Sequence, residues 1–161
     1  MRTTRVQADP GVPLIIVERH FTAPPALVYR AWTEPDLLTR WLGPKDLKLT
    51  VDRWEFHDGG RWRYVSTGPD GSEYAFRGLF HGEPSLQYGI TQTFEFEGFP
   101  GAVSLETLSF IPADGGTLTR TISAFTTVEA RDGKVASGME DGMTQGFAQL
   151  DDLLVELQGA R

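Results

Sequence analysis

Short apolar segments separated by turn residues follow one another from residue 47 to residue 127. The breaks between them are rich in Gly, Pro, Asp and Ser, and they read HDGG, TGPDGSE, GEPS, EGFPGA and PADGG. These residues favour tight turns, and the intervening segments alternate polar and apolar side chains, as in Trp62-Arg63-Tyr64. Because such short turns join neighbouring antiparallel strands, the series predicts an antiparallel meander of about six strands.

The segments on either side of this series predict one further strand and three helices. LIIVERHFT (residues 14–22) is apolar and β-branched, which is typical of a strand. Two short helices are expected next, because Pro24, Pro25 and Pro35 suit helix starts ahead of apolar stripes. The longest helix is expected over residues 132–158, where apolar side chains recur every three or four positions, at Val135, Met139, Met143, Phe147, Leu150, Leu154 and Leu157.

A sheet of this size has a face that must be covered, and one long helix can cover it. The order of elements therefore predicts an α+β fold, in which an antiparallel sheet of about six or seven strands packs against the long C-terminal helix. Residues 1–13 contain Pro10, Gly11 and Pro13 and predict a flexible leader, so a single domain is expected over residues 14–161. An open sheet also leaves edge strands, which keeps a homodimer as an alternative to a monomer.

The composition excludes several classes of partner. The chain has 161 residues, no cysteine and a net charge of −7. An acidic surface without a basic patch repels phosphate backbones and anionic lipids, so neither nucleic acid nor a membrane is expected as a partner. The N-terminal residues contain no apolar signal segment, and no apolar run is long enough to span a bilayer. Together with the absence of cysteine, which fits a reducing compartment, this predicts a cytoplasmic location.

Three glycines interrupt the long predicted helix. Gly138, Gly142 and Gly146 recur at every fourth position and so form one row on the helix surface. Each glycine inside a helix costs about 1 kcal/mol relative to alanine, so the row requires an explanation. One explanation is close packing of the helix backbone against a strand. The other is a space between helix and sheet that holds a ligand, with Met139 and Met143 as an adaptable apolar wall.

Three stretches of the chain resemble one group of proteins: VERHFTAPPALVYRAWTEPDLLTRWLGP (residues 17–44), FHDGGRWRY (residues 56–64) and ASGMEDGMTQGFAQLDDLL (residues 136–154). They are similar to the START-like, helix-grip superfamily, which includes polyketide cyclases and birch-pollen-allergen-like proteins. Within it, the chain most resembles bacterial proteins similar to the C-terminal domain of the activator of the ninety-kilodalton heat-shock protein ATPase. The resemblance implies a curved antiparallel sheet that grips the long C-terminal helix, with a cavity between them. It therefore favours the space over close packing, although these families share a cavity without sharing a reaction.

Polar groups that face such a cavity are the candidates for catalysis. In VSLETLSFIP the alternation places Glu106 on one face with Leu108 and Phe110, and an inward carboxyl group has a raised pKa and can act as a general base. A glutamate that reaches water at a strand end is the favoured alternative, because an unpaired glutamate is seldom buried. Glu55 and His57 share a face in RWEFHDGG and form a second candidate for proton transfer, with a satisfied pair at the cavity rim as the favoured alternative.

The sequence predicts neither a metal nor a cofactor. The histidines are not spaced as metal ligands, and neither a G-x-S-x-G elbow nor a phosphate-binding glycine loop is present. The residues expected to line the cavity come from the strands, the short helices and the long helix, and they include two glycines of the long helix. The predicted lining residues are Trp41, Trp62, Tyr64, Phe76, Tyr88, Gln92, Glu106, Met139, Gly142, Met143, Gly146 and Phe147.

Three functions are compatible with these features. The first is binding of a small apolar or amphipathic molecule in the cavity, which follows from the glycine row and the aromatic strand faces. The second is an enzyme of the cyclase or hydrolase type, in which a cavity acid or His57 moves a proton; it requires Glu106 to point inward. The third is activation of a heat-shock protein ATPase. Eukaryotic activators of this kind carry an additional N-terminal domain, for which 161 residues leave no room, so this function ranks last.

Overall fold

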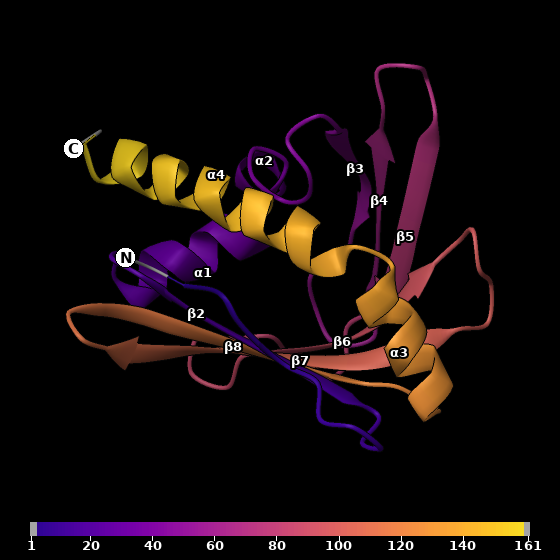
Figure 1. Ribbon diagram of the computed structural model, residues 1–161. Helices are drawn as coiled ribbons and strands as arrows, with labels where there is room; N and C mark the ends of the chain where they lie inside the picture. Colours follow the sequence, from indigo (N-terminus) through magenta and orange to yellow (C-terminus); the bar gives the residue numbers. More distant parts are fainter. Residues whose placement is uncertain (1–2, 160–161) are drawn as a thin grey trace.

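The computed structural model describes residues 3–159, which form one antiparallel sheet with four helices (Figure 1). Its eight strands are β1 (Arg5–Gln7), β2 (Leu14–Phe21), β3 (Lys48–Trp54), β4 (Arg61–Thr67), β5 (Glu73–Leu79), β6 (Ile90–Phe96), β7 (Val103–Ala113) and β8 (Gly116–Ala124). They are ordered β1-β2-β8-β7-β6-β5-β4-β3, so β3 to β8 form the predicted meander. The turn between β7 and β8 carries Asp114 and Gly115 at φ values of 48° and 74°, as a two-residue hairpin turn requires.

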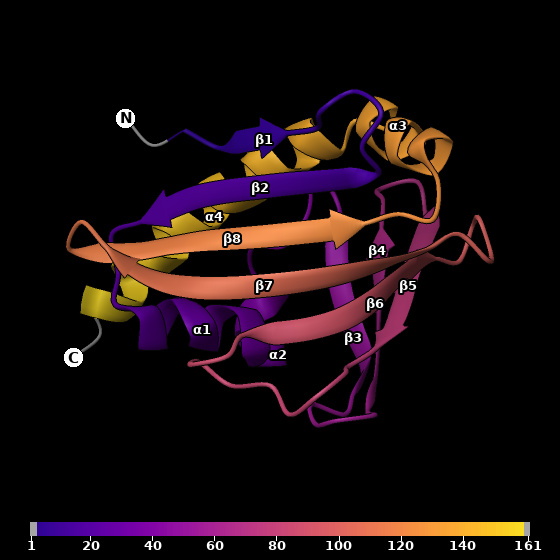
Figure 2. The ribbon, with the colours of Figure 1, turned by 90° about the horizontal axis from the view of Figure 1, so that it is seen from below.

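The sheet bends between its two ends, and the bend creates the concave face that α4 (Met139–Gly159) crosses (Figure 1, Figure 2). β2, β8 and β7 run side by side in one half, whereas β3, β4 and β5 turn away from that direction. The two halves meet at the short β5–β6 pairing, which in the described chain joins Phe76 to Phe96 and Arg77 to Glu95. The predicted α+β helix-grip fold is confirmed.

Two short helices follow β2 at the predicted prolines. These are α1 (Pro25–Thr33) and α2 (Pro35–Leu38), and each begins with a proline, whose fixed φ suits the first helical turn. Within residues 3–159, no helix is both long enough and apolar enough to cross a membrane.

The predicted helix over residues 132–158 is two helices, α3 (Val128–Ala136) and α4. Gly138 separates them with a φ of 86°, the left-handed conformation that ends many helices. It therefore does not belong to a glycine row inside one helix, and that part of the prediction is wrong. α3 also begins earlier than expected, because the Thr127 hydroxyl accepts a hydrogen bond from the first helical turn and caps it.

Part of the predicted N-terminal leader forms a strand. Arg5–Gln7 form the edge strand β1, which pairs with β2 and brings the strand count from the predicted six or seven to eight. Arg131 of α3 is 3% exposed and donates a hydrogen bond to the backbone oxygen of Asp9 (2.9 Å), which fastens the β1–β2 connection to α3 (Figure 2). Residues 1–2 of the predicted leader and residues 160–161 of the predicted domain lie outside the described residues.

Aromatic rings fill the interior beneath the middle of α4. The ring centroid of Phe147 lies 5.5 Å from that of Phe21, 6.2 Å from that of Trp32 and 6.2 Å from that of Trp41. Trp41 is 2% exposed, and its indole N–H donates to the carbonyl oxygen of Ala31 (2.9 Å). This part of the interior is a packed core, so the predicted cavity between helix and sheet does not lie here.

Close packing, rather than open space, explains Gly146 inside α4. A Cβ atom on Gly146 would lie 3.0 Å from the carbonyl oxygen of Trp41 and 3.2 Å from the nitrogen of Gly43. Nε2 of Gln149 donates to the carbonyl oxygens of both Trp41 and Gly43 at 3.1 Å and holds that loop in place. A Cβ on Gly142 would lie 3.4 Å from its nearest neighbour, an ordinary contact. The predicted space beneath the glycine row is therefore wrong, because α4 packs on the loop after α2.

Candidate functional site

The concave face carries a row of polar side chains on β6, β7 and β8. Gln92, Glu106 and Ser123 are register partners in these neighbouring strands, so they point to the same side of the sheet. Nε2 of Gln92 donates to Oε1 of Glu106 (3.1 Å), and the Ser123 hydroxyl donates to Oε2 (3.1 Å). Leu108 and Phe110 follow on the same face and are buried in the core, so Glu106 points inward. The favoured alternative of a glutamate turned outward at a strand end is wrong.

Burial changes the acidity of Glu106. Desolvation raises the pKa of its carboxyl group above the ordinary 4.5, while the hydrogen bonds from Gln92 and Ser123 and the charge of Lys134 act in the opposite direction. Desolvation, and then repulsion from Glu106, also raises the pKa of the Tyr64 hydroxyl. A carboxyl group with a raised pKa exchanges its proton nearer to neutral pH than an exposed glutamate does.

Four aromatic rings on β4, β5 and β6 lie on the same face, and we call them the aromatic cluster: Trp62, Tyr64, Phe76 and Phe94. Their ring centroids are separated by 5.0 Å (Trp62–Tyr64), 5.5 Å (Tyr64–Phe76), 5.5 Å (Phe76–Phe94) and 5.8 Å (Phe94–Trp62), so each ring contacts two others, and Phe76 also contacts Phe96 at 5.2 Å. Trp62 is buried, whereas the other three rings are partly exposed. The cluster therefore leaves apolar surface accessible on the face that the helices cover, which is typical of ligand-binding sites.

One cation from α3 reaches the aromatic cluster. Nζ of Lys134 lies 4.8 Å from the centroid of the Phe94 ring, which is a cation–π distance. Desolvation lowers the pKa of the Lys134 amine, and the charge of Glu106 opposes this shift. An acid and an amine thus interact electrostatically beside a set of apolar rings.

The structure separates the predicted lining residues into groups. Five of them meet at this site: Trp62, Tyr64, Phe76, Gln92 and Glu106. Met139 and Met143 of α4 are partly buried and pack against the hydrophobic core. Four others belong to the packing of α4 on the core and on the loop after α2: Trp41, Gly142, Gly146 and Phe147. Tyr88 is 83% exposed in the turn before β6, so its prediction as a lining residue is wrong.

Glu55 and His57 lie outside this site. Oε2 of Glu55 accepts a hydrogen bond from Nε of Arg53 (2.7 Å), and Oε1 accepts one from the backbone N–H of Arg61 (3.1 Å). The contact with Arg53 is the main reason why the pKa of Glu55 lies below its usual range. His57 is exposed and its Nδ1 lies 3.0 Å from the backbone oxygen of Asp58, and in the described chain no hydrogen bond joins it to the Glu55 side chain. A proton-transfer pair is therefore not formed here.

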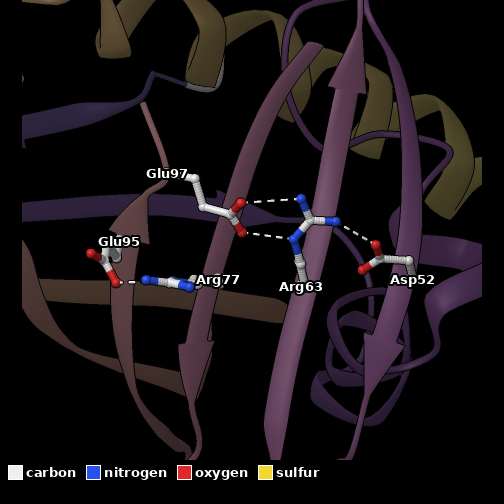
Figure 3. Close-up of polar contacts among 5 residues, drawn as sticks. All are labelled: Asp52, Arg63, Arg77, Glu95 and Glu97. Atoms are coloured by element: carbon white, nitrogen blue, oxygen red, sulfur yellow. Dashed lines mark hydrogen bonds and ion pairs between the residues drawn. The ribbon is translucent and has the colours of Figure 1, made fainter. Parts of the chain in front are cut away.

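The convex face of the sheet carries a network of ion pairs (Figure 3). Arg63 of β4 donates to Glu97 (2.7 Å) and to Asp52 of β3, and Arg77 of β5 donates to Glu95 of β6 (3.1 Å). The carboxylates of Glu97 and Asp52 raise the pKa of Arg63. The network joins neighbouring strands, and each of its two guanidinium groups and three carboxylates already has a partner within it.

Two open hollows lie beside α4, where it meets α2 and α1. The first is lined by Arg40, Gln149, Asp152, Leu153 and Glu156, and the second by Pro24, Ala26, Leu27, Arg30, Leu157 and Gln158. Neither hollow contains a predicted lining residue, so neither corresponds to the predicted cavity. In the described part of the chain, His, Asp and Glu side chains do not form a group of three able to hold a metal ion.

The sequence analysis missed Ser123, Lys134 and Phe94 as members of the site. Ser123 continues the alternation of hydroxyl side chains along β8, but this pattern does not say which face of the strand is covered. Phe94 alternates in the same way along β6. Lys134 was not recognised because the direction of its side chain depends on α3 being a separate helix. The sequence around Gly138 predicts instead the interior of one longer helix.

Comparisons with known proteins agree with this architecture. The family model described as "Activator of Hsp90 ATPase homolog 1-like protein" matches residues 22–155. A protein from Rhodobacter sphaeroides, solved by crystallography, is 31% identical over 94% of this chain and 99% of that chain, with a TM-score of 0.85. A protein from Arthrobacter aurescens, solved by NMR, is 28% identical over 94% of this chain and 91% of that chain, with a TM-score of 0.84. Among curated proteins, none is a significant match.

Proposed function

Because the chain belongs to the family of Activator of Hsp90 ATPase homolog 1-like proteins and has its helix-grip fold, we propose that it binds a small amphipathic molecule on the concave face of its sheet. The apolar part of this molecule packs on the aromatic cluster. Its polar end meets Gln92, Glu106 and Ser123. The cytoplasmic location expected from the sequence is part of this proposal.

The inward carboxyl group of Glu106 is the observation that carries the proposal. A buried carboxyl group is unfavourable unless it is hydrogen-bonded, and Glu106 accepts a hydrogen bond on each oxygen. It lies on the same face as partly exposed aromatic rings, and ligand sites typically combine apolar walls with a few such polar groups. On this face desolvation is the main cause of the shifted pKa values, whereas on the convex face the pKa of Arg63 is raised mainly by its ion pairs, and desolvated titratable groups favour a functional site.

Glu106 also supports a second candidate function, proton transfer to or from the bound molecule. A general acid or base works best when its pKa lies near the working pH, and desolvation shifts the pKa of Glu106 in that direction. Glu55 and His57 lie outside the site, so Glu106 is the carboxyl group that serves this role. An enzyme of this kind would bind its substrate in the same position as the proposed ligand.

Calorimetric titration with hydrocinnamyl alcohol, which has one aromatic ring and one hydroxyl group, tests the binding proposal. Glu106→Leu is expected to weaken binding about fivefold, because a hydrogen bond contributes about 1 kcal/mol and 1.4 kcal/mol corresponds to a factor of ten. Phe94→Ala is expected to weaken it as well, since it removes an apolar contact. The matched control Tyr88→Ser changes an exposed ring outside the site and is expected to leave binding unchanged.

Two outcomes contradict the proposal. One is equal affinity in the parent, Glu106→Leu and Phe94→Ala proteins. The other combines two negative results. Neither hydrocinnamyl alcohol nor decanol, a purely aliphatic alcohol used as a second probe, binds, and native mass spectra contain no molecule carried over from the expression host.

A further inference from the structure

Lys134 differs from the other lysines of the chain in its surroundings. The chain has three lysines, and Lys45 and Lys48 are exposed while Lys134 is partly buried. Lysine is seldom buried unless its charge is paired. Lys134 nevertheless extends from α3 to the ring of Phe94, at 4.8 Å, in the middle of the candidate site.

The amine of Lys134 has no close anionic partner. Within residues 3–159 its Nζ takes part in a cation–π contact and a longer-range attraction to Glu106, but in no hydrogen bond or ion pair. The nearby acid on α3, Asp132, forms its ion pair with Arg131 (2.9 Å) rather than with Lys134. Desolvation lowers the pKa of this amine, so its neutral form, which is the nucleophile, is more accessible than in an exposed lysine.

The groups around Lys134 also provide a means of proton transfer. Glu106 of β7 is the carboxyl group that interacts with Lys134 electrostatically, and desolvation raises its pKa while lowering that of the lysine. Gln92 and Ser123 hold the two carboxyl oxygens of Glu106 at 3.1 Å, so the acid is oriented in advance. Tyr64 of β4 is the other titratable group near this carboxyl, and it stays protonated because desolvation raises its pKa.

We propose that Lys134 captures the carbonyl group of an aldehyde or ketone ligand as an imine, with Glu106 as the proton carrier. This inference rests on the proposed function, because it assigns a chemical class to the molecule bound on the concave face. The apolar body of the carbonyl compound packs on the aromatic cluster, which places its carbonyl carbon beside Nζ of Lys134.

The reaction needs no oxidant or reductant. The lone pair of the neutral Nζ attacks the carbonyl carbon, and one proton passes from nitrogen to the carbonyl oxygen through Glu106 to give a carbinolamine. Protonated Glu106 then donates its proton to the hydroxyl group, which leaves as water while the nitrogen lone pair forms the C=N bond. The products are an iminium cation, a Glu106 carboxylate that neutralises it, and one water molecule, and the steps are reversible by hydrolysis.

Reductive trapping with hydrocinnamaldehyde and sodium cyanoborohydride tests this inference. The reductant converts an imine into a stable secondary amine, and peptide mapping separates label on Lys134 from label on Lys45, Lys48 and the terminal amine. We expect most of the label on Lys134. In Lys134→Arg, which keeps the positive charge, and in Lys134→Met, total labelling should fall to the level of the exposed amines, whereas Lys48→Arg should retain the Lys134 label.

Two further measurements distinguish failure of the proton carrier, of the imine and of the binding site. Glu106→Gln should slow labelling of Lys134 by roughly a hundredfold, the low end of what a positioned general acid contributes. An unchanged rate in Glu106→Gln overturns its role as proton carrier. If Lys134 is labelled no faster than Lys45 and Lys48 while hydrocinnamyl alcohol still binds, the imine is overturned and the binding site is retained. If neither compound binds, the proposed function fails with it.

Discussion

Arg19 of β2 and Asp151 of α4 are joined by two hydrogen bonds, of 2.8 Å and 2.6 Å, that connect the sheet to the helix covering it. The Arg19 side chain is 7% exposed and that of Asp151 is 24% exposed, so the pair is largely shielded from water. Removal of one partner from a largely buried pair costs stability, because the remaining charge keeps its desolvation penalty and loses this attraction. We therefore predict that Arg19→Met lowers the free energy of unfolding by about 2 kcal/mol, less than a fully buried pair because Asp151 retains some solvent.

Urea unfolding followed by circular dichroism measures this loss. The matched control is Arg30→Met, which removes the exposed pair between Arg30 of α1 and Glu34 just after it (53% and 48% exposed) and is expected to leave stability unchanged. Equal effects of the two substitutions would show that the Arg19–Asp151 pair does not hold α4 to the sheet.

The two glycines inside α4 should respond to alanine in opposite directions. Gly142→Ala adds a Cβ at an ordinary contact distance of 3.4 Å and gains helix propensity, so it is expected to raise stability by up to about 1 kcal/mol. Gly146→Ala places a Cβ 3.0 Å from the carbonyl oxygen of Trp41, which Gln149 holds, so overpacking is expected to lower stability by about 1 kcal/mol or more. Thermal unfolding compares them directly, and stabilisation by both substitutions would contradict the close packing.

The pH dependence of stability should reveal the burial of Glu106. Its pKa is raised in the folded protein, so the unfolded chain releases this proton at a lower pH than the folded protein does. The stability that this difference provides is complete below the ordinary pKa of 4.5 and is lost as the pH rises through the folded-state value. Relative to Glu106→Gln, the parent protein is therefore expected to lose stability between acidic and neutral pH.

Glu55→Gln is the matched control for this prediction, because the pKa of Glu55 is shifted in the opposite direction to that of Glu106. The pKa of Glu55 is lowered, mainly by Arg53, so its contribution is present above the unfolded-state pKa and is lost as the pH falls through the folded-state value. Urea unfolding of the three proteins at a series of pH values should give slopes of opposite sign for the two substitutions. Slopes of the same sign would show that the folded protein lowers the pKa of Glu106 and would contradict its burial.

The name of the family raises the question of Hsp90. The function proposed here lies on the concave face and uses a small molecule, so we predict that this protein, at saturating concentration, leaves the ATPase rate of purified Hsp90 unchanged. A coupled ATPase assay measures the rate, and a pull-down under the same conditions detects binding. A saturable increase in rate would replace the small-molecule proposal with the co-chaperone function.

The sequence was sufficient for most of the fold. Pro25 and Pro35 begin α1 and α2 as expected, and the turn residues separate β3 to β8 in the predicted order. These features depend on local chemistry, namely the fixed φ of proline and the short turns between antiparallel strands. β1 was missed because three residues flanked by turns form a strand only through pairing with β2.

The candidate site was less predictable because it depends on tertiary contacts. Alternation along β7 placed Glu106 with Leu108 and Phe110, but whether water or protein covers that face depends on where α3 and α4 dock. The glycines of α4 were misread for the same reason. A missing side chain means either space or close contact, and only the position of the loop over residues 41–44 distinguishes the two.

NMR mapping of a hydrocinnamyl alcohol titration tests the central claim most directly. We predict saturable shifts of the backbone amides of Gln92, Phe94, Glu106 and Ser123, with the amides of Glu55 and Tyr88 unchanged. Shifts that gather instead at Gln149 and Asp152, beside the open hollow next to α2, would contradict the site on the concave face.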